Sequence, residues 1–178
     1  MAAGTTRQSL KVLQERLASR LATAQVSGAD AAWLAVELRG QKALLPLVHS
    51  GEIFSVPVIQ RVPHTQSWFM GVAALRGGLM GVVDLGALLM PDLPAVPTLG
   101  LSEAKLVALH PSLGVNAALW VDRLLGLRGV SLFHSVEQPA GANASALGQV
   151  LIDAQGQRWQ EINLHAVAEW PEFLSVAA

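Results

Sequence analysis

A series of short apolar segments between residues 33 and 164 sets the strongest limit on the fold of this chain. Each segment is about as long as a β-strand, and turns containing Gly, Pro or Asn separate them. The segments are WLAVELRG (33–40), KALLPLV (42–48), GLMGVVDL (78–85), KLVALH (105–110), AALWVDRLLGL (117–127), GQVLIDAQG (148–156) and RWQEINL (158–164). Many short strands at near-regular spacing indicate an all-β barrel or sandwich. The last two segments predict a hairpin with Ala154, Gln155 and Gly156 in its turn.

Helical periodicity is confined to the two ends of the chain. Residues 5–26 carry leucines at spacings of three and four, which form one apolar stripe: Leu10, Leu13, Leu17 and Leu21. This predicted helix is basic, so it either packs on protein or lies on a membrane surface. Its stripe has no Trp or Phe anchor, which favours packing. A short helix is expected within residues 162–174, ending near Pro171.

Composition excludes several classes of protein. The 12 Lys and Arg against 13 Asp and Glu leave no surplus of cations for a nucleic-acid backbone. Cys is absent, which excludes disulfides, thiol catalysis and Cys-ligated metals. The longest charge-free run, residues 106–121, is shorter than the roughly 20 residues of a spanning helix. Charged residues also interrupt any signal-peptide core near the N-terminus, so we expect a soluble, cytoplasmic protein.

The sequence carries no motif for catalysis, metal binding or cofactor binding. None of its five histidines lies three or four residues from another, as two metal ligands on one helix would. Phosphate-binding glycine motifs and a nucleophile elbow are also missing. Asp84 and Asp122 each follow an apolar pair, but nothing in the sequence brings them together as a dyad. We expect no catalytic residue, no cofactor and no metal; a small β-barrel ligand-binding protein is the remote alternative.

Residues 45–89 resemble the first lobe of the CheW-like family, the adaptors of bacterial chemosensory arrays. The matching motifs are Glu52-Ile53, Arg61-Val62-Pro63, GVAALRG (71–77) and VVDL (82–85). The resemblance continues through AALWVDRLLGLRGV (117–130) and LGQVLIDAQGQRWQEINLHAV (147–167), and covers about residues 32–174. Three stretches are most like the type IV pilus (twitching-motility) branch: residues 61–77, 157–164 and 171–177. One departure is Ala74, where the family commonly has Asn.

The resemblance implies an all-β fold of two small five-stranded SH3-like barrels around a shared apolar seam. Residues 1–30 would form an amphipathic helical extension, residues 31–174 the CheW-like domain with a short C-terminal helix, and residues 175–178 a tail. Lobe one would span about 43–90 and lobe two about 101–160, with strands exchanged between them. The implied function is a non-catalytic adaptor between the cytoplasmic tip of a methyl-accepting chemoreceptor and the regulatory domain of a CheA-type histidine kinase. It would be cytoplasmic and recruited to membrane-associated receptor arrays, at the cell pole; a flagellar or other chemosensory pathway is the alternative.

The resemblance also implies which residues contact partners: Glu52, Ile53, Gly71, Leu75, Arg76 and Gly77. We expect Glu52 and Arg76 to form an ion pair that shapes the receptor groove; the alternative is that Arg76 only satisfies turn carbonyls. If semi-buried, this pair would be costly to break on one side. Asp84 and Asp122 are expected to cap turns at strand ends through their side-chain oxygens; the alternative is direct contact with a partner. Binding should come from apolar strand edges and rims rather than from charge.

Overall fold

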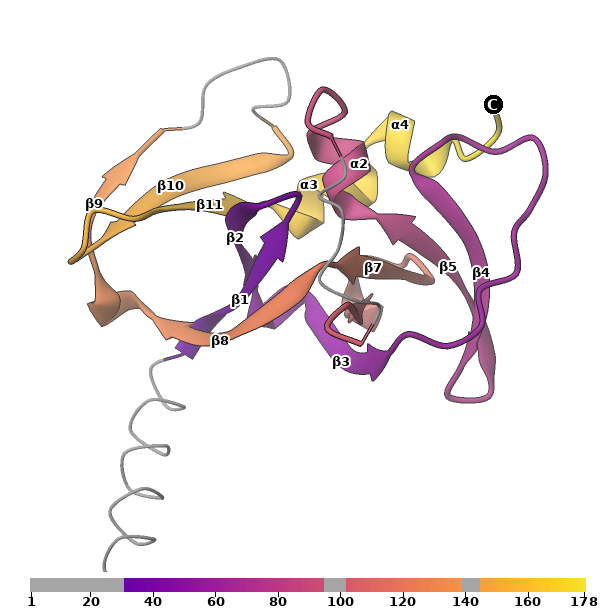
Figure 1. Cartoon of the computed structure of the whole chain (residues 1–178), viewed down its shortest axis with the longest axis horizontal. Coiled ribbons are helices and arrows are strands. Elements are labelled where there is room, and N and C mark those ends of the chain that lie inside the picture. The colour runs from indigo at the N-terminus through magenta and orange to yellow at the C-terminus, as the bar shows by residue number, and fades with distance from the viewer. Residues whose placement is uncertain (1–30, 95–101, 139–144) are drawn as a thin grey trace, which may run out of the picture.

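The computed structural model describes residues 31–94, 102–138 and 145–178. Two sheets lie side by side, and three short helices gather along their junction (Figure 1). The helices are α2 (Leu85–Leu89), α3 (Leu164–Glu169) and α4 (Pro171–Leu174), and single 3-10 turns cover Leu47–His49 (η1), Pro111–Leu113 (η2) and Val130–Leu132 (η3). The expected N-terminal helix over residues 5–26 lies outside the described residues.

The first sheet has six strands drawn from both ends of the chain. Their order is β8 (Arg123–Gly129), β1 (Ala31–Leu38), β2 (Gln41–Pro46), β11 (Arg158–Ile162), β10 (Leu147–Asp153) and β9 (Phe133–Glu137). All neighbours are antiparallel except β11 and β2, which run parallel. Strands β10 and β11 form the hairpin that the sequence predicts, with its turn after Asp153.

The second sheet has five strands from one continuous stretch. Their order is β3 (Ser50–Ser55), β6 (Lys105–Leu109), β7 (Ala117–Val121), β5 (Gly78–Asp84) and β4 (Phe69–Leu75). Strands β5 and β7 run parallel, whereas the other neighbours are antiparallel. An isolated bridge between Gln60 and Val72 pairs the β3–β4 connection with edge strand β4.

The all-β architecture confirms the expected fold class. The number of strands in each sheet differs in part from the expectation. One sheet has the five strands expected for each lobe, but the other has six. Strands β6 and β7 lie within residues 101–160 and pair with β3 and β5, and β2 pairs with β11, so strands from each expected lobe take part in both sheets. The segment 117–127 is two strands, because the chain passes from one sheet to the other at Asp122.

The remaining differences concern three strands and the C-terminal helix. Strands β3, β4 (Phe69–Leu75) and β9 are not among the strand-length segments predicted from the sequence. Half of the residues of β3 and most of those of β9 face solvent, so these two strands lack the apolar alternation by which strands are recognised. The C-terminal helix is divided, and Pro171 begins α4 rather than ending α3. Proline fits there because the first helical position needs no intrahelical N–H donor.

A shared apolar seam joins the two sheets. Successive side chains of a strand point to opposite faces. On β1, Leu34, Val36 and Leu38 therefore enter the largest core cluster, together with Val83 and Leu119 of the five-stranded sheet. The opposite faces hold smaller cores, one around Leu44, Leu151 and Trp159 and another around Leu75, Leu106 and Trp120. The seam expected from the family resemblance is thus present, with a separate interior in each lobe.

Candidate functional site

An ion pair joins the two edge strands of the five-stranded sheet. Arg76 and Gly77 form the two-residue turn between β4 and β5, and both have positive φ (49° and 74°), as hairpin turns of the favoured type require. From this turn the Nε of Arg76 pairs with Oε2 of Glu52 on β3. Farther along, Gln60 and Val72 exchange two backbone hydrogen bonds of 2.8 and 2.9 Å. Together these contacts close the sheet across its open side.

This ion pair lies on the surface. The side chain of Arg76 is 73% exposed and that of Glu52 is 39% exposed. The condition for a costly, semi-buried pair is therefore not met, and an exposed pair contributes only about 0–1 kcal/mol to stability. The pair is more important as a fixed polar feature than as a source of stability.

Exposed aliphatic side chains lie near the pair in sequence. Ile53 follows Glu52 on β3, and Leu79 on β5 follows the Arg76-Gly77 turn and is 61% exposed. These five residues, Glu52, Ile53, Arg76, Gly77 and Leu79, are here called the ion-pair patch. These residues combine exposed apolar side chains with a charged pair.

Two of the residues expected to contact partners are buried. Leu75 packs in the core of the five-stranded lobe. Gly71 has φ +130°, and a Cβ there would overlap the carbonyl oxygen of Gln60. Gly71 therefore allows the β3–β4 connection to approach β4 closely. Their burial leaves Gly71 and Leu75 out of the ion-pair patch.

A second group of exposed aliphatic residues lies on the other sheet. Strand β8, the η3 turn and strand β9 carry four of them within ten residues of sequence, each between 48% and 62% exposed: Leu127, Val130, Leu132 and Val136. We call this group the β8–β9 ridge. Sequence reasoning missed it, because these side chains have the spacing of neither a helix face nor a half-buried strand.

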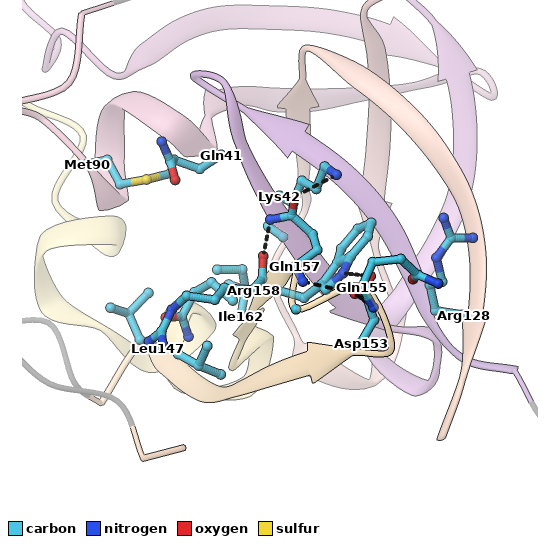
Figure 2. Close-up of a pocket in the computed structure, with 15 residues that line it drawn as sticks. Gln41, Lys42, Met90, Arg128, Leu147, Asp153, Gln155, Gln157, Arg158 and Ile162 are labelled. Carbon is cyan, nitrogen blue, oxygen red and sulfur yellow. Dashed lines mark hydrogen bonds between the residues drawn. The ribbon is translucent and has the colours of Figure 1, made fainter. Parts of the chain in front are cut away.

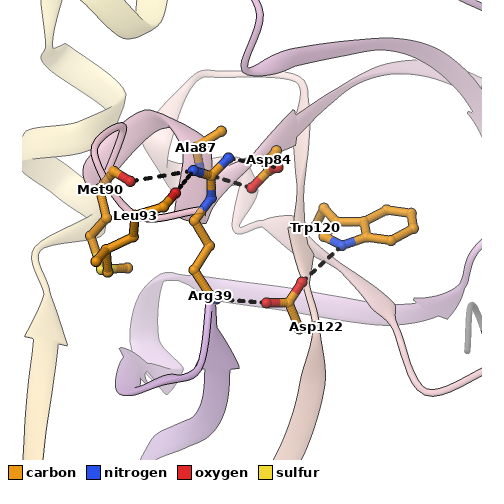
Figure 3. A network of polar contacts seen from close by, with 7 residues as sticks. All are labelled: Arg39, Asp84, Ala87, Met90, Leu93, Trp120 and Asp122. Carbon is orange, nitrogen blue, oxygen red and sulfur yellow. Dashed lines mark hydrogen bonds and ion pairs between the residues drawn. The ribbon is translucent and has the colours of Figure 1, made fainter. Parts of the chain in front are cut away.

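Asp84 and Asp122 meet in one polar network (Figure 3). Asp84 Oδ1 accepts a 2.8 Å hydrogen bond from the Ala87 N–H and so caps α2. Asp122 Oδ2 accepts a 2.6 Å bond from the backbone N–H of Arg39, and its Oδ1 accepts one of 3.3 Å from the Trp120 indole. The guanidinium of Arg39 lies 3.7 Å from Asp84 Oδ2. The two aspartates are thus connected through a residue that sequence reasoning did not single out.

Arg39 belongs to a tripeptide that recurs along the chain. Leu-Arg-Gly occurs at 38–40, 75–77 and 127–129, and at the first two places Arg and Gly form a two-residue hairpin turn with positive φ. In both, the arginine leaves its own hairpin to contact a different element.

A pocket of about 830 Å³ opens at the end of the six-stranded lobe (Figure 2). Its lining includes Lys42, Arg128, Asp153 and Arg158, a convergence of charges that the sequence did not indicate. Most of these charged groups already interact with other residues of this chain. Lys42 Nζ donates to Gln157 Oε1 at 2.9 Å, Arg158 pairs with Glu137 at 2.7 Å, and Asp153 Oδ2 accepts from the Trp159 indole at 2.9 Å. Lys42 and Arg128 each also lie 5.2 Å from the centre of the Trp159 ring.

The described part of the chain offers no group of three or more His, Asp or Glu side chains arranged to hold a metal ion. Among the same residues, no helix has the length and apolar character needed to cross a membrane.

The arrangement of the two sheets is that of a CheW scaffold. A solved structure, the scaffolding protein TtCheW from Thermoanaerobacter tengcongensis, matches with a TM-score of 0.66 and 16% identity, covering 83% of this chain and 97% of that one. Residues 32–172 match the family of CheW-like domains, and the chain belongs to this family. It is also 27% identical over 164 residues to Protein PilI of Pseudomonas aeruginosa, covering 91% of this chain and 89% of the relative.

Proposed function

We propose that this protein is a non-catalytic adaptor that couples a methyl-accepting chemoreceptor to a CheA-type histidine kinase. The carrying observation is the presence of two groups of exposed apolar residues on different sheets, the ion-pair patch and the β8–β9 ridge. A bridging protein needs two separate surfaces, and exposed apolar groups rimmed by polar residues mark protein-binding sites. Membership of the CheW-like family supports the same role.

The ion-pair patch is the surface for the receptor tip, and the β8–β9 ridge is the surface for the kinase regulatory domain. The patch contains Glu52, Ile53, Arg76 and Gly77, residues of the motifs that carry the family resemblance. The ridge lies on β8 and β9, the two end strands of the other sheet, so the two partners would not compete for one site.

The pathway is type IV pilus (twitching) chemosensory signalling, in the cytoplasm at membrane-associated receptor arrays. The motifs of residues 61–77 and 157–164 and the identity to Protein PilI support this branch.

A titration against both partners tests the function. The wild-type chain is titrated with the kinase regulatory domain and with a receptor tip fragment from the same cell. Leu79→Asp should weaken only receptor binding and Val130→Asp only kinase binding, because each buries a charge in one contact. Val48→Asp is the matched control, since Val48 is 70% exposed and belongs to neither surface. A folded wild-type chain that binds neither partner overturns the proposal; binding only to another pathway's kinase reassigns the pathway to a flagellar or other system.

A further inference from the structure

Arg39 crosses from the six-stranded lobe to the other lobe. It sits in the β1–β2 turn with φ 49°, and its side chain is 15% exposed. Its Nη1 donates to the carbonyl oxygens of Leu93 and, at 3.4 Å, of Met90, which follow α2. Its Nη2 lies near Asp84, the last residue of β5. Figure 3 shows the guanidinium reaching into the end of α2.

The backbone of Arg39 is fixed as well. Its N–H donates to Asp122, and the Asp122 N–H donates to the Glu37 carbonyl at 3.0 Å. Asp122 is the single residue between β7 of one sheet and β8 of the other. Both ends of Arg39 are therefore bonded where the two lobes meet.

Gly86 on α2 provides the space for this side chain. A Cβ at position 86 would lie 2.8 Å from Arg39 Cγ and 3.3 Å from Cδ. Such a methyl group would force the arginine stem to move. Gly86 and Arg39 are thus sterically matched, although they belong to elements of different lobes.

The Arg39 contacts supply something that the apolar seam does not. Hydrophobic burial holds two surfaces together but is non-directional, whereas hydrogen bonds have preferred distances and angles. Burying Arg39 also reduces stability, because its Nε is buried with no hydrogen-bond partner among the described residues. A cation kept there despite that cost is better explained by positioning than by stability.

We propose that Arg39 is a positioning residue that fixes the relative orientation of the two lobes. The consequence rests on the proposed function: the same contacts set the spacing between the ion-pair patch and the β8–β9 ridge. An adaptor with this spacing fixed presents its two partners to each other in one geometry.

Distance measurements between the lobes test the orientation directly. The chain has no cysteine, so Ala74→Cys on β4 and Ala154→Cys in the β10–β11 turn, both exposed, introduce the only two labelling sites. Pulsed electron–electron double resonance between the two spin labels then reports the distribution of distances between them. In Arg39→Met and in Gly86→Ala we expect a shifted or broader distribution, and no further change when the two are combined.

Arg123→Met is the matched control. Arg123 on β8 pairs with Glu103 at 2.7 Å, also between the lobes, but both side chains are considerably more exposed than Arg39. Its loss should leave the distribution unchanged. The proposal is overturned if the distributions of folded Arg39→Met and Gly86→Ala superimpose on the reference, or if Arg123→Met broadens it equally. Should Arg39→Met fail to fold, Gly86→Ala alone decides.

A binding experiment separates this inference from the proposed function. Arg39→Met should bind each partner singly with wild-type affinity but form less of the ternary complex with receptor tip and kinase domain. If the wild-type chain binds no partner, the function fails while the distance result still stands. If ternary assembly is normal despite an altered distance distribution, Arg39 positions the lobes without consequence for bridging.

Discussion

The indole N–H of Trp159 donates a 2.9 Å hydrogen bond to Oδ2 of Asp153 across the β10–β11 hairpin. This bond, followed by backbone donors from Gln157 and Gln155 and the charge of Lys42, lowers the pKa of Asp153 below its ordinary value of 3.8. Desolvation opposes the shift but does not reverse it. The hairpin end is thus organised around an ionised carboxylate.

A carboxylate with a lowered pKa in the folded state stabilises the protein only while it is ionised. Its contribution is complete above pH 3.8 and is lost as the pH falls through the lowered pKa. Asp153→Asn should therefore flatten the acid limb of the stability curve, measured as urea midpoints from pH 5 downward. Asp92→Asn, at an exposed position, controls for the change in charge. Equal acid limbs in wild type and Asp153→Asn would contradict the prediction.

Gly71 and Gly77 should respond differently to alanine. Gly77 has φ +74° but open space around it, so Gly77→Ala should cost about 1–2 kcal/mol of unfolding free energy from backbone strain alone. Gly71→Ala adds a collision with the Gln60 carbonyl and should cost more. Urea denaturation of both variants measures the difference. A smaller loss at Gly71 would show that the β3–β4 connection moves freely away from β4.

The Glu52–Arg76 pair should influence binding more than stability. Because both side chains are exposed, Glu52→Ala and Arg76→Ala should each change the free energy of unfolding by less than about 1 kcal/mol. Their effects on receptor affinity should be non-additive, with the double variant close to either single one. Arg61→Ala removes another exposed charge as a control. Strictly additive losses would show that the two residues act independently.

Asp84 should reveal its capping role through two substitutions. Asp84→Ala removes the acceptor for the Ala87 N–H and should cost about 1 kcal/mol in unfolding free energy. Asparagine caps helices comparably, so Asp84→Asn should cost less. Thermal or urea unfolding provides the comparison. Equal losses would instead assign the effect to the missing charge beside Arg39.

The fold class followed from local patterns, whereas strand partnership did not. Segments such as GQVLIDAQG and RWQEINL are apolar enough to be recognised as strands, and Ala154 to Gly156 mark the turn between these two. Which sheet β6 and β7 join depends on contacts distant in sequence, which no local pattern encodes. In β3 and β9 only Phe54 and Phe133 pack against a core, so neither strand shows a regular apolar alternation.

The candidate site could be predicted only in part, because some of its features also depend on contacts between residues distant in sequence. The Glu52–Arg76 pair came from motifs that resemble a family, and the structure places these residues in contact. The burial of Gly71 and Leu75 depends on the β3–β4 connection folding back over β4. Arg39 lies in a short turn between two strands, and its importance appears only when α2 packs beside it.

The division of strands between the sheets makes one lobe an insertion within the other. All strands of the five-stranded sheet lie between residues 50 and 121, whereas the six-stranded sheet needs residues 31–46 together with 123–162. During synthesis the inner lobe has all its strands once residue 121 has emerged. The six-stranded lobe cannot complete its sheet until β10 and β11 have been synthesised. Until then, the seam faces of β1 and β2 can pack only on the completed five-stranded lobe. The inner lobe can thus serve as the template on which its host is completed.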